Sequence, residues 1–139
     1  MSFREKSAWI TFVLLLAFGI YFGEVAAHML DPTRPHTNYL QLFVLLVVAI
    51  VVLEIITHAV IAFRSPHEAQ TPIDERERLI ELRSTRPAFF VLLVGAFLSV
   101  GTIHMGASTW LLAHCVLLAI WLAELTRYGS QLYHYRRGA

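Results

Sequence analysis

The chain has 139 residues, of which 57% are hydrophobic and 15% charged, whereas a soluble domain is nearer half apolar and a quarter charged. This composition indicates a protein that lies in lipid, and the length fits one domain over residues 1–139. The net charge of +1 argues against nucleic acid as a partner. The single cysteine, Cys115, excludes an intrachain disulfide and a four-cysteine metal site.

Four apolar segments are long enough to cross about 30 Å of hydrocarbon as α-helices that rise about 1.5 Å per residue. They are predicted at residues 8–28, 39–63, 87–105 and 109–128. Pro32 and Pro35 interrupt the chain after the first segment, and a short turn at 106–108 separates the last two. The sequence therefore predicts an all-α integral membrane four-helix bundle in contact with the lipid bilayer.

The basic residues predict the orientation of these spans. Of the 11 Lys and Arg residues, Arg34 alone falls in the loop after the first span, so the other ten lie on one side. This asymmetry places both termini and the loop 64–86 in the cytoplasm.

A short amphipathic helix is expected within the loop 64–86, starting near Thr71 and Pro72. Its apolar residues would lie on the membrane surface and include Leu79, Ile80 and Leu82. The loop is either a solvated connector or a docking surface for a cytoplasmic protein partner.

Ionisable residues inside the spans are the candidates for function, because each costs about 2.5–3.5 kcal/mol or more at the bilayer centre unless it is paired or hydrated. They are Glu24, His28, Glu54, His58, His104, His114 and Glu124. All seven are candidate metal ligands. The spacing Glu-x-x-x-His occurs twice and puts a carboxylate and an imidazole on one helix face.

The expected depths divide these residues into two clusters. Glu24, His28, His104 and His114 would lie in the outer leaflet, with His36 of the outer loop above them. Such a set suits Zn²⁺, Cu²⁺ or Fe²⁺, or a b-type haem between two imidazoles, with His28 and His104, or His104 and His114, as the ligands.

The second expected cluster lies in the inner leaflet and contains Glu54, His58 and Glu124. Two carboxylates close together would share a proton and form a protonatable site. Alternatively, Glu124 pairs with Arg127 one turn away, and the buried polar residues serve only to hydrogen-bond neighbouring helices.

Three stretches resemble a known group of proteins. Residues 2–10 (SFREKSAWI), 74–83 (DERERLIELR) and 135–138 (YRRG) are similar to the start, middle loop and end of small bacterial membrane proteins that share a domain of unknown function. Families of this kind often accompany small helix-turn-helix regulators. The resemblance implies a multi-pass protein of the bacterial inner membrane, but no activity.

Three functions remain open from the sequence. The first is a bundle that binds a transition metal or haem, with enzymatic activity if a coordination position is open to water. The second is a proton-coupled small transporter that acts as a homodimer, for which Gly19 and Gly23 would permit close helix approach. The third is a non-catalytic regulatory or accessory subunit.

Overall fold

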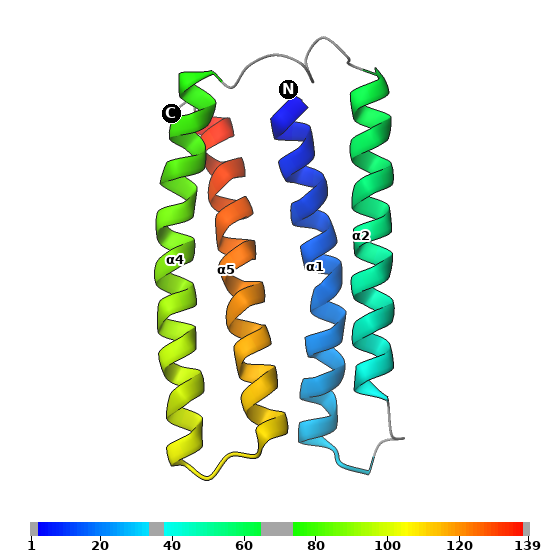
Figure 1. Cartoon of the computed structure of the whole chain (residues 1–139), viewed down its shortest axis with the longest axis vertical. Helices are drawn as coiled ribbons and strands as arrows, with labels where there is room; N and C mark the ends of the chain where they lie inside the picture. Colours follow the sequence, from blue (N-terminus) through cyan, green and yellow to red (C-terminus); the bar gives the residue numbers. More distant parts are fainter. Residues whose placement is uncertain (1–2, 34–37, 65–73, 138–139) are drawn as a thin grey trace. The chain divides into compact units, whose positions relative to one another are not determined.

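The computed structural model describes residues 3–33, 38–64 and 74–137, and its regular elements are all α-helices (Figure 1). The helices are α1 (Phe3–Leu30), α2 (Tyr39–Arg64), α4 (Glu75–His104) and α5 (Thr109–Arg137). Each is long and apolar enough to cross a membrane. These findings confirm the prediction of an all-α chain with four spans and indicate a multi-pass membrane protein.

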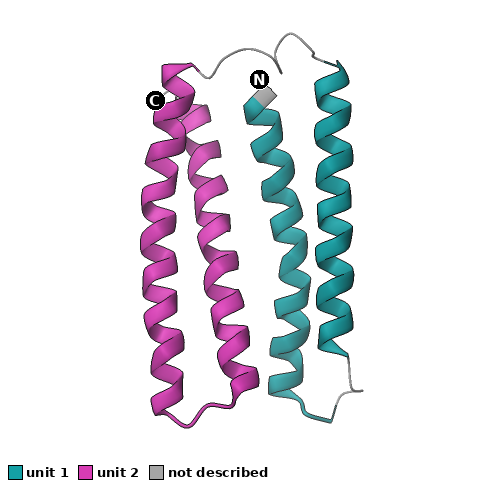
Figure 2. Ribbon diagram, in the orientation of Figure 1, with its two compact units in different colours: residues 1–71 teal, residues 72–139 magenta. Residues whose placement is uncertain are grey.

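The chain forms two compact units, residues 1–71 and 72–139, where the sequence suggests one domain (Figure 2). Each unit is an antiparallel pair of helices, α1 with α2 and α4 with α5. The division follows from the contacts along the chain, because each helix packs mainly on its sequence neighbour.

Polar side chains cap the start of one helix in each pair. The backbone N–H of Gln41 donates to Oδ1 of Asn38 at 3.2 Å, and that of Leu111 donates to Oγ of Ser108 at 3.2 Å. The turn before Ser108 uses Gly106 at a φ of 76°, which a glycine adopts without steric cost. The predicted starts at residues 39 and 109 are therefore confirmed.

Helix α4 differs from the prediction of a short helix followed by a separate span from Pro87. It is one continuous helix with Pro87 inside it. Proline removes a backbone donor, so the carbonyl of Arg83 loses its helical partner. Pro87 is exposed, and the Glu-, Arg- and Leu-rich segment before it favours a helix, so the helix continues through it.

The apolar face of this segment also differs from the prediction. Ile80 is only 1% exposed and belongs to the core of the second unit, not to a membrane-surface face. Leu79 and Leu82 are exposed. The helix begins after Asp74, whereas Thr71 and Pro72 lie outside the described residues.

Small residues form the contact between α4 and α5. Besides Ile80 and Leu132, the buried residues are all small: Ser84, Ala88 and Ser99 of α4 and Ala119 and Ala123 of α5. Their serine hydroxyls donate to carbonyls of the same helix, Ser84 to Ile80 at 2.6 Å and Ser99 to Gly95 at 2.7 Å. With those hydroxyls satisfied, the two helices can approach closely through steric fit, as small residues permit in membranes.

The first unit is held by a mixed seam. In α1 the buried residues are Ala8, Thr11, Tyr21 and Val25, spaced for one helix face. Tyr21 packs against Phe18 of its own helix and Phe43 of α2, with ring centroids 5.7 and 5.6 Å away. By contrast, no residue of α2 is fully buried. Gly23 is expected to allow close helix approach, but a Cβ added at this position would meet no atom within 4 Å. No helix therefore packs closely on Gly23 among the described residues.

Gly95→Ala should destabilise the protein by about 1–3 kcal/mol, because the added Cβ would lie 2.5 Å from Cβ of Ala119. Gly101→Ala in the same helix is the matched control, since its Cβ would meet nothing within 4 Å. That control should be neutral or stabilising by up to about 1 kcal/mol. Unfolding in mixed detergent micelles measures both, and equal effects would contradict the close contact.

Candidate functional site

Four polar side chains meet across the seam between α1 and α2. Oγ of Ser7 lies 2.5 Å from Nε2 of His58, and Oγ1 of Thr11 donates to Oε1 of Glu54 at 2.9 Å. Ser7 and Thr11 are four residues apart on α1, as are Glu54 and His58 on α2. The antiparallel helices therefore bring two polar layers together, one helical turn apart.

The hydrogen bonds define the tautomer of His58. Its Nδ1 lies 2.7 Å from the backbone carbonyl oxygen of Glu54. A carbonyl only accepts, so Nδ1 carries the proton and donates. In the neutral ring, Nε2 therefore carries the lone pair and accepts from the hydroxyl of Ser7. A proton added at Nε2 would reverse that bond, with the ring donating to Oγ of Ser7.

The carboxylate of Glu54 is satisfied by a neutral donor. Thr11, 8% exposed, supplies the hydrogen bond to Oε1. Among the described residues, no cationic side chain forms an ion pair with Glu54. In a span, an ionised carboxylate is costly without a cation, and binding one proton would remove its charge. The site can therefore exchange a proton, with Thr11 fixing the carboxylate.

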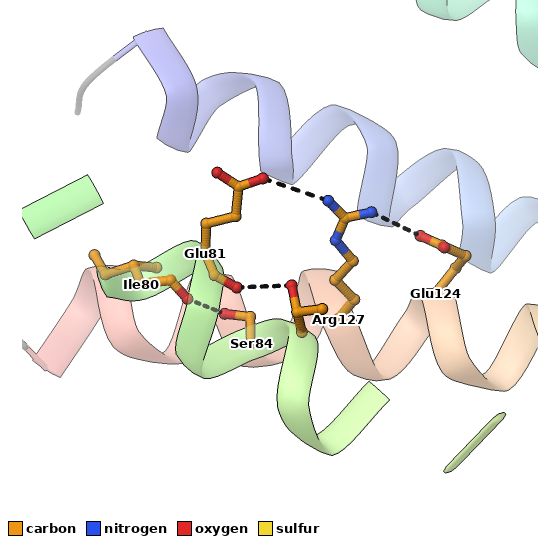
Figure 3. A network of polar contacts seen from close by, with 6 residues as sticks. Ile80, Glu81, Ser84, Glu124 and Arg127 are labelled. Atoms are coloured by element: carbon orange, nitrogen blue, oxygen red, sulfur yellow. Dashed lines mark hydrogen bonds and ion pairs between the residues drawn. The ribbon is translucent and has the colours of Figure 1, made fainter. Parts of the chain in front are cut away.

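Glu124 has a different environment from Glu54. Arg127 lies between two carboxylates, 3.8 Å from Glu124 and 3.6 Å from Glu81 (Figure 3). The edge pair with Arg127, one of the two alternatives from the sequence, is thus present in the second unit. Of the expected inner cluster, the structure brings together Glu54 and His58 within the first unit.

The residues of the expected outer cluster are divided between the two units. Glu24 is exposed on α1, and the ring of His28 lies 5.5 Å from that of Tyr39. His104 ends α4 and is exposed. His36 lies outside the described residues.

His114 of the second unit resembles His58 in its bonding. Its Nδ1 donates to the carbonyl of Trp110 at 2.7 Å, and the Trp110 ring lies 4.1 Å from its own. Within residues 3–33, 38–64 and 74–137, no group of three or more His, Cys, Asp or Glu side chains is arranged to hold a metal ion.

Sequence reasoning identified Glu54 and His58 but missed Ser7 and Thr11. Both hydroxyl residues stand at the start of the first span, where small polar residues are ordinary. Their shared spacing of four residues was the available signal, because it matches the spacing of Glu54 and His58 on an antiparallel neighbour.

Thr11→Val should destabilise the protein by about 0.6–1.7 kcal/mol, the range of hydrogen bonds between membrane helices. The loss should vanish when Glu54 is already leucine, because the two residues form one interaction. Thr126→Val is the matched control, since that hydroxyl bonds only the carbonyl of Leu122 in its own helix. A double-mutant cycle by unfolding in micelles measures the coupling, and additive losses would contradict the contact.

The sequence matches no family model, no curated protein and no solved structure.

Proposed function

We propose that this protein is a proton-coupled small transporter of a bacterial inner membrane, acting as a homodimer with Glu54 as its proton-binding group. The observation that carries the proposal is the carboxylate of Glu54 in the α1–α2 seam, bonded to the hydroxyl of Thr11. An intramembrane acid of this kind is by default a functional site, because purely apolar packing would avoid its cost.

The hydrogen-bond donors around Glu54 favour a proton over a metal cation at this carboxylate. Thr11 directs its hydroxyl hydrogen at Oε1, and the backbone carbonyl of Glu54 accepts from His58. Mg²⁺ and Ca²⁺ need about six or more oxygen ligands, which two side-chain oxygens and one hydroxyl do not supply. A proton needs only the carboxylate itself.

Helix number and exposure support a homodimer. Four spans are few for a solute path, and a second copy would double them. The span of α2 has no fully buried residue. On α1, Gly23 is exposed with open space where a Cβ would be, so a small-residue face is open to another helix.

The basic residues support the orientation that this proposal uses. Ten of the 11 fall near the two termini or between residues 64 and 86, and the preference of basic residues for the cytoplasmic side supports a cytoplasmic location for these segments. The resemblance of residues 2–10 and 74–83 to small bacterial membrane proteins supports an inner-membrane location.

Glu54→Gln should abolish solute-driven proton movement, because an amide cannot exchange a proton. The measurement uses sealed vesicles containing purified protein and an internal pH dye, with amino acids, amines and organic acids added outside in turn. The matched control is Glu124→Gln, which removes a carboxylate that is ion-paired with Arg127. It should keep at least about a tenth of the wild-type rate.

Two results would contradict this function. If no solute class moves protons in wild-type vesicles, transport is wrong. If Glu54→Gln retains the wild-type response, the proton-binding group has been misassigned.

A bound transition metal or haem is the second candidate, favoured by the orientation of two histidines. His58 and His114 each donate Nδ1–H to a backbone carbonyl, which leaves Nε2 with the lone pair that binds a metal ion. In His58 such an ion would replace the hydrogen bond between Nε2 and Ser7. Because the described residues hold no group of three ligands, the ion would need ligands from a second copy of the chain.

Metal analysis and the absorbance spectrum of detergent-purified protein test this candidate. Stoichiometric Zn, Fe or Cu, or a Soret band, should be lost from His58→Gln and His114→Gln if it holds. His134→Gln, near the C-terminal end of α5, is the control and should retain the signal. Wild-type protein without metal or Soret absorbance would remove the candidate.

A further inference from the structure

The two ends of the α1–α2 seam differ in polarity on either side of Glu54. Towards the N-terminus of α1, the next layer is the contact between Ser7 and His58 at 2.5 Å. That layer is one helical turn from Thr11 and Glu54, about 5–6 Å, a gap that one water molecule can bridge. Polar groups therefore lead from Glu54 to this end of the hairpin.

In the other direction, the seam is apolar. Residues 12–20 of α1 and 42–53 of α2 contain no polar side chain. Nine residues of helix span about 13 Å, too far for one water to cross. Within these stretches Phe18 and Phe43 pack together, and both contact Tyr21, which is only 2% exposed. Within the hairpin, no polar side chain of these stretches offers a proton a path in this direction.

We infer that Glu54 takes up its proton from the side of the membrane that holds the N-terminus of α1, and that His58 and Ser7 relay it. The inference rests on the proposed proton-binding role of Glu54. It adds the route of the proton and the residues that carry it.

The relay follows from the bonding of His58. The Ser7 hydroxyl passes its hydrogen to Nε2 of the neutral ring and takes a replacement proton from water at this end of the hairpin, so that the ring becomes an imidazolium while Nδ1–H stays bonded to the carbonyl of Glu54. The ring then returns the proton from Nε2 through a bridging water to the carboxylate. The result is a neutral imidazole and a neutral carboxylic acid, with one proton taken from solution.

The charged residues at this end of the hairpin are Arg4, Glu5 and Lys6 on α1 and Arg64 on α2. Between Glu54 and Arg64, His58 is the one titratable residue of α2. Ala8, 4% exposed, and Thr11 complete the α1 surface at the site.

The test is a rapid change of pH outside sealed vesicles that contain the protein. The rate of protonation is measured from the infrared absorbance of the protonated carboxyl group, a band that the Glu54→Gln variant lacks. Vesicles are sorted by access to a tag at the N-terminus. The band should respond quickly when the N-termini face the jump, and at least about tenfold more slowly when they face the lumen.

Variants identify the relay. His58→Leu should slow the fast response at least about tenfold, and Ser7→Ala should slow it in the same direction. His28→Leu is the matched control, because it makes the same substitution at the opposite end of the hairpin and should leave the rate unchanged. Ser7→Ala also keeps the test decisive if His58→Leu does not fold.

The outcomes separate the inference from the proposed function. Equal responses from both sides, or an unchanged rate in both His58→Leu and Ser7→Ala, would overturn the relay while Glu54 remained the proton site. If the wild type shows no band that depends on Glu54, both the relay and the proton site are wrong.

Discussion

The cost of placing a carboxylate among apolar helices is the constraint on which the first unit depends. Glu54 meets that cost through Thr11, which donates to Oε1 at 2.9 Å. The bond requires α1 and α2 to be antiparallel in one register, and the same register brings Ser7 to His58. Phe18 and Phe43 then meet further along the seam. Polar and aromatic contacts thus specify one pairing that apolar side chains alone would leave loosely defined.

The two helices of the second unit pack through small side chains, whereas the hydrogen bond between Thr11 and Glu54 joins the helices of the first unit. Its close helix contact comes from Gly95 against Ala119, with serine hydroxyls bonded within their own helix. Its charged groups gather where Arg127 bridges Glu81 and Glu124. Glu124 is therefore ion-paired with Arg127, whereas Glu54 is bonded to a neutral hydroxyl. That difference is why we propose proton exchange at Glu54 and not at Glu124.

The sequence predicts the spans well because their signal is strong and local. Apolar runs fix the four helices, and caps such as Asn38 fix where a helix starts. It predicts Pro87 as a helix start wrongly, since the helix-forming segment before Pro87 continues through it and buries Ile80 and Ser84 in the second unit. Hydropathy carries no information on such contacts between helices.

The candidate site was predictable only in part, because the sequence does not show which residues of neighbouring helices meet. Glu54 and His58 stand out because their neighbours are Val, Leu and Ile. Ser7 and Thr11 become visible only once the register of α1 against α2 is known. Gly95 packs closely against Ala119, whereas Gly23 has no neighbour within 4 Å of an added Cβ. The spacing of glycines in the sequence does not distinguish these two cases.

Disulfide cross-linking of paired cysteines in the membrane tests the central contact most directly. In a Cys115→Ser background, Ser7→Cys with His58→Cys should cross-link rapidly under mild oxidation, because those side chains touch across the seam. Ser7→Cys with Ala59→Cys is the control, since Ala59 is exposed on another face of α2, and it should cross-link slowly. Equal rates for the two pairs, or faster linking through position 59, would contradict the register that places Glu54 beside Thr11.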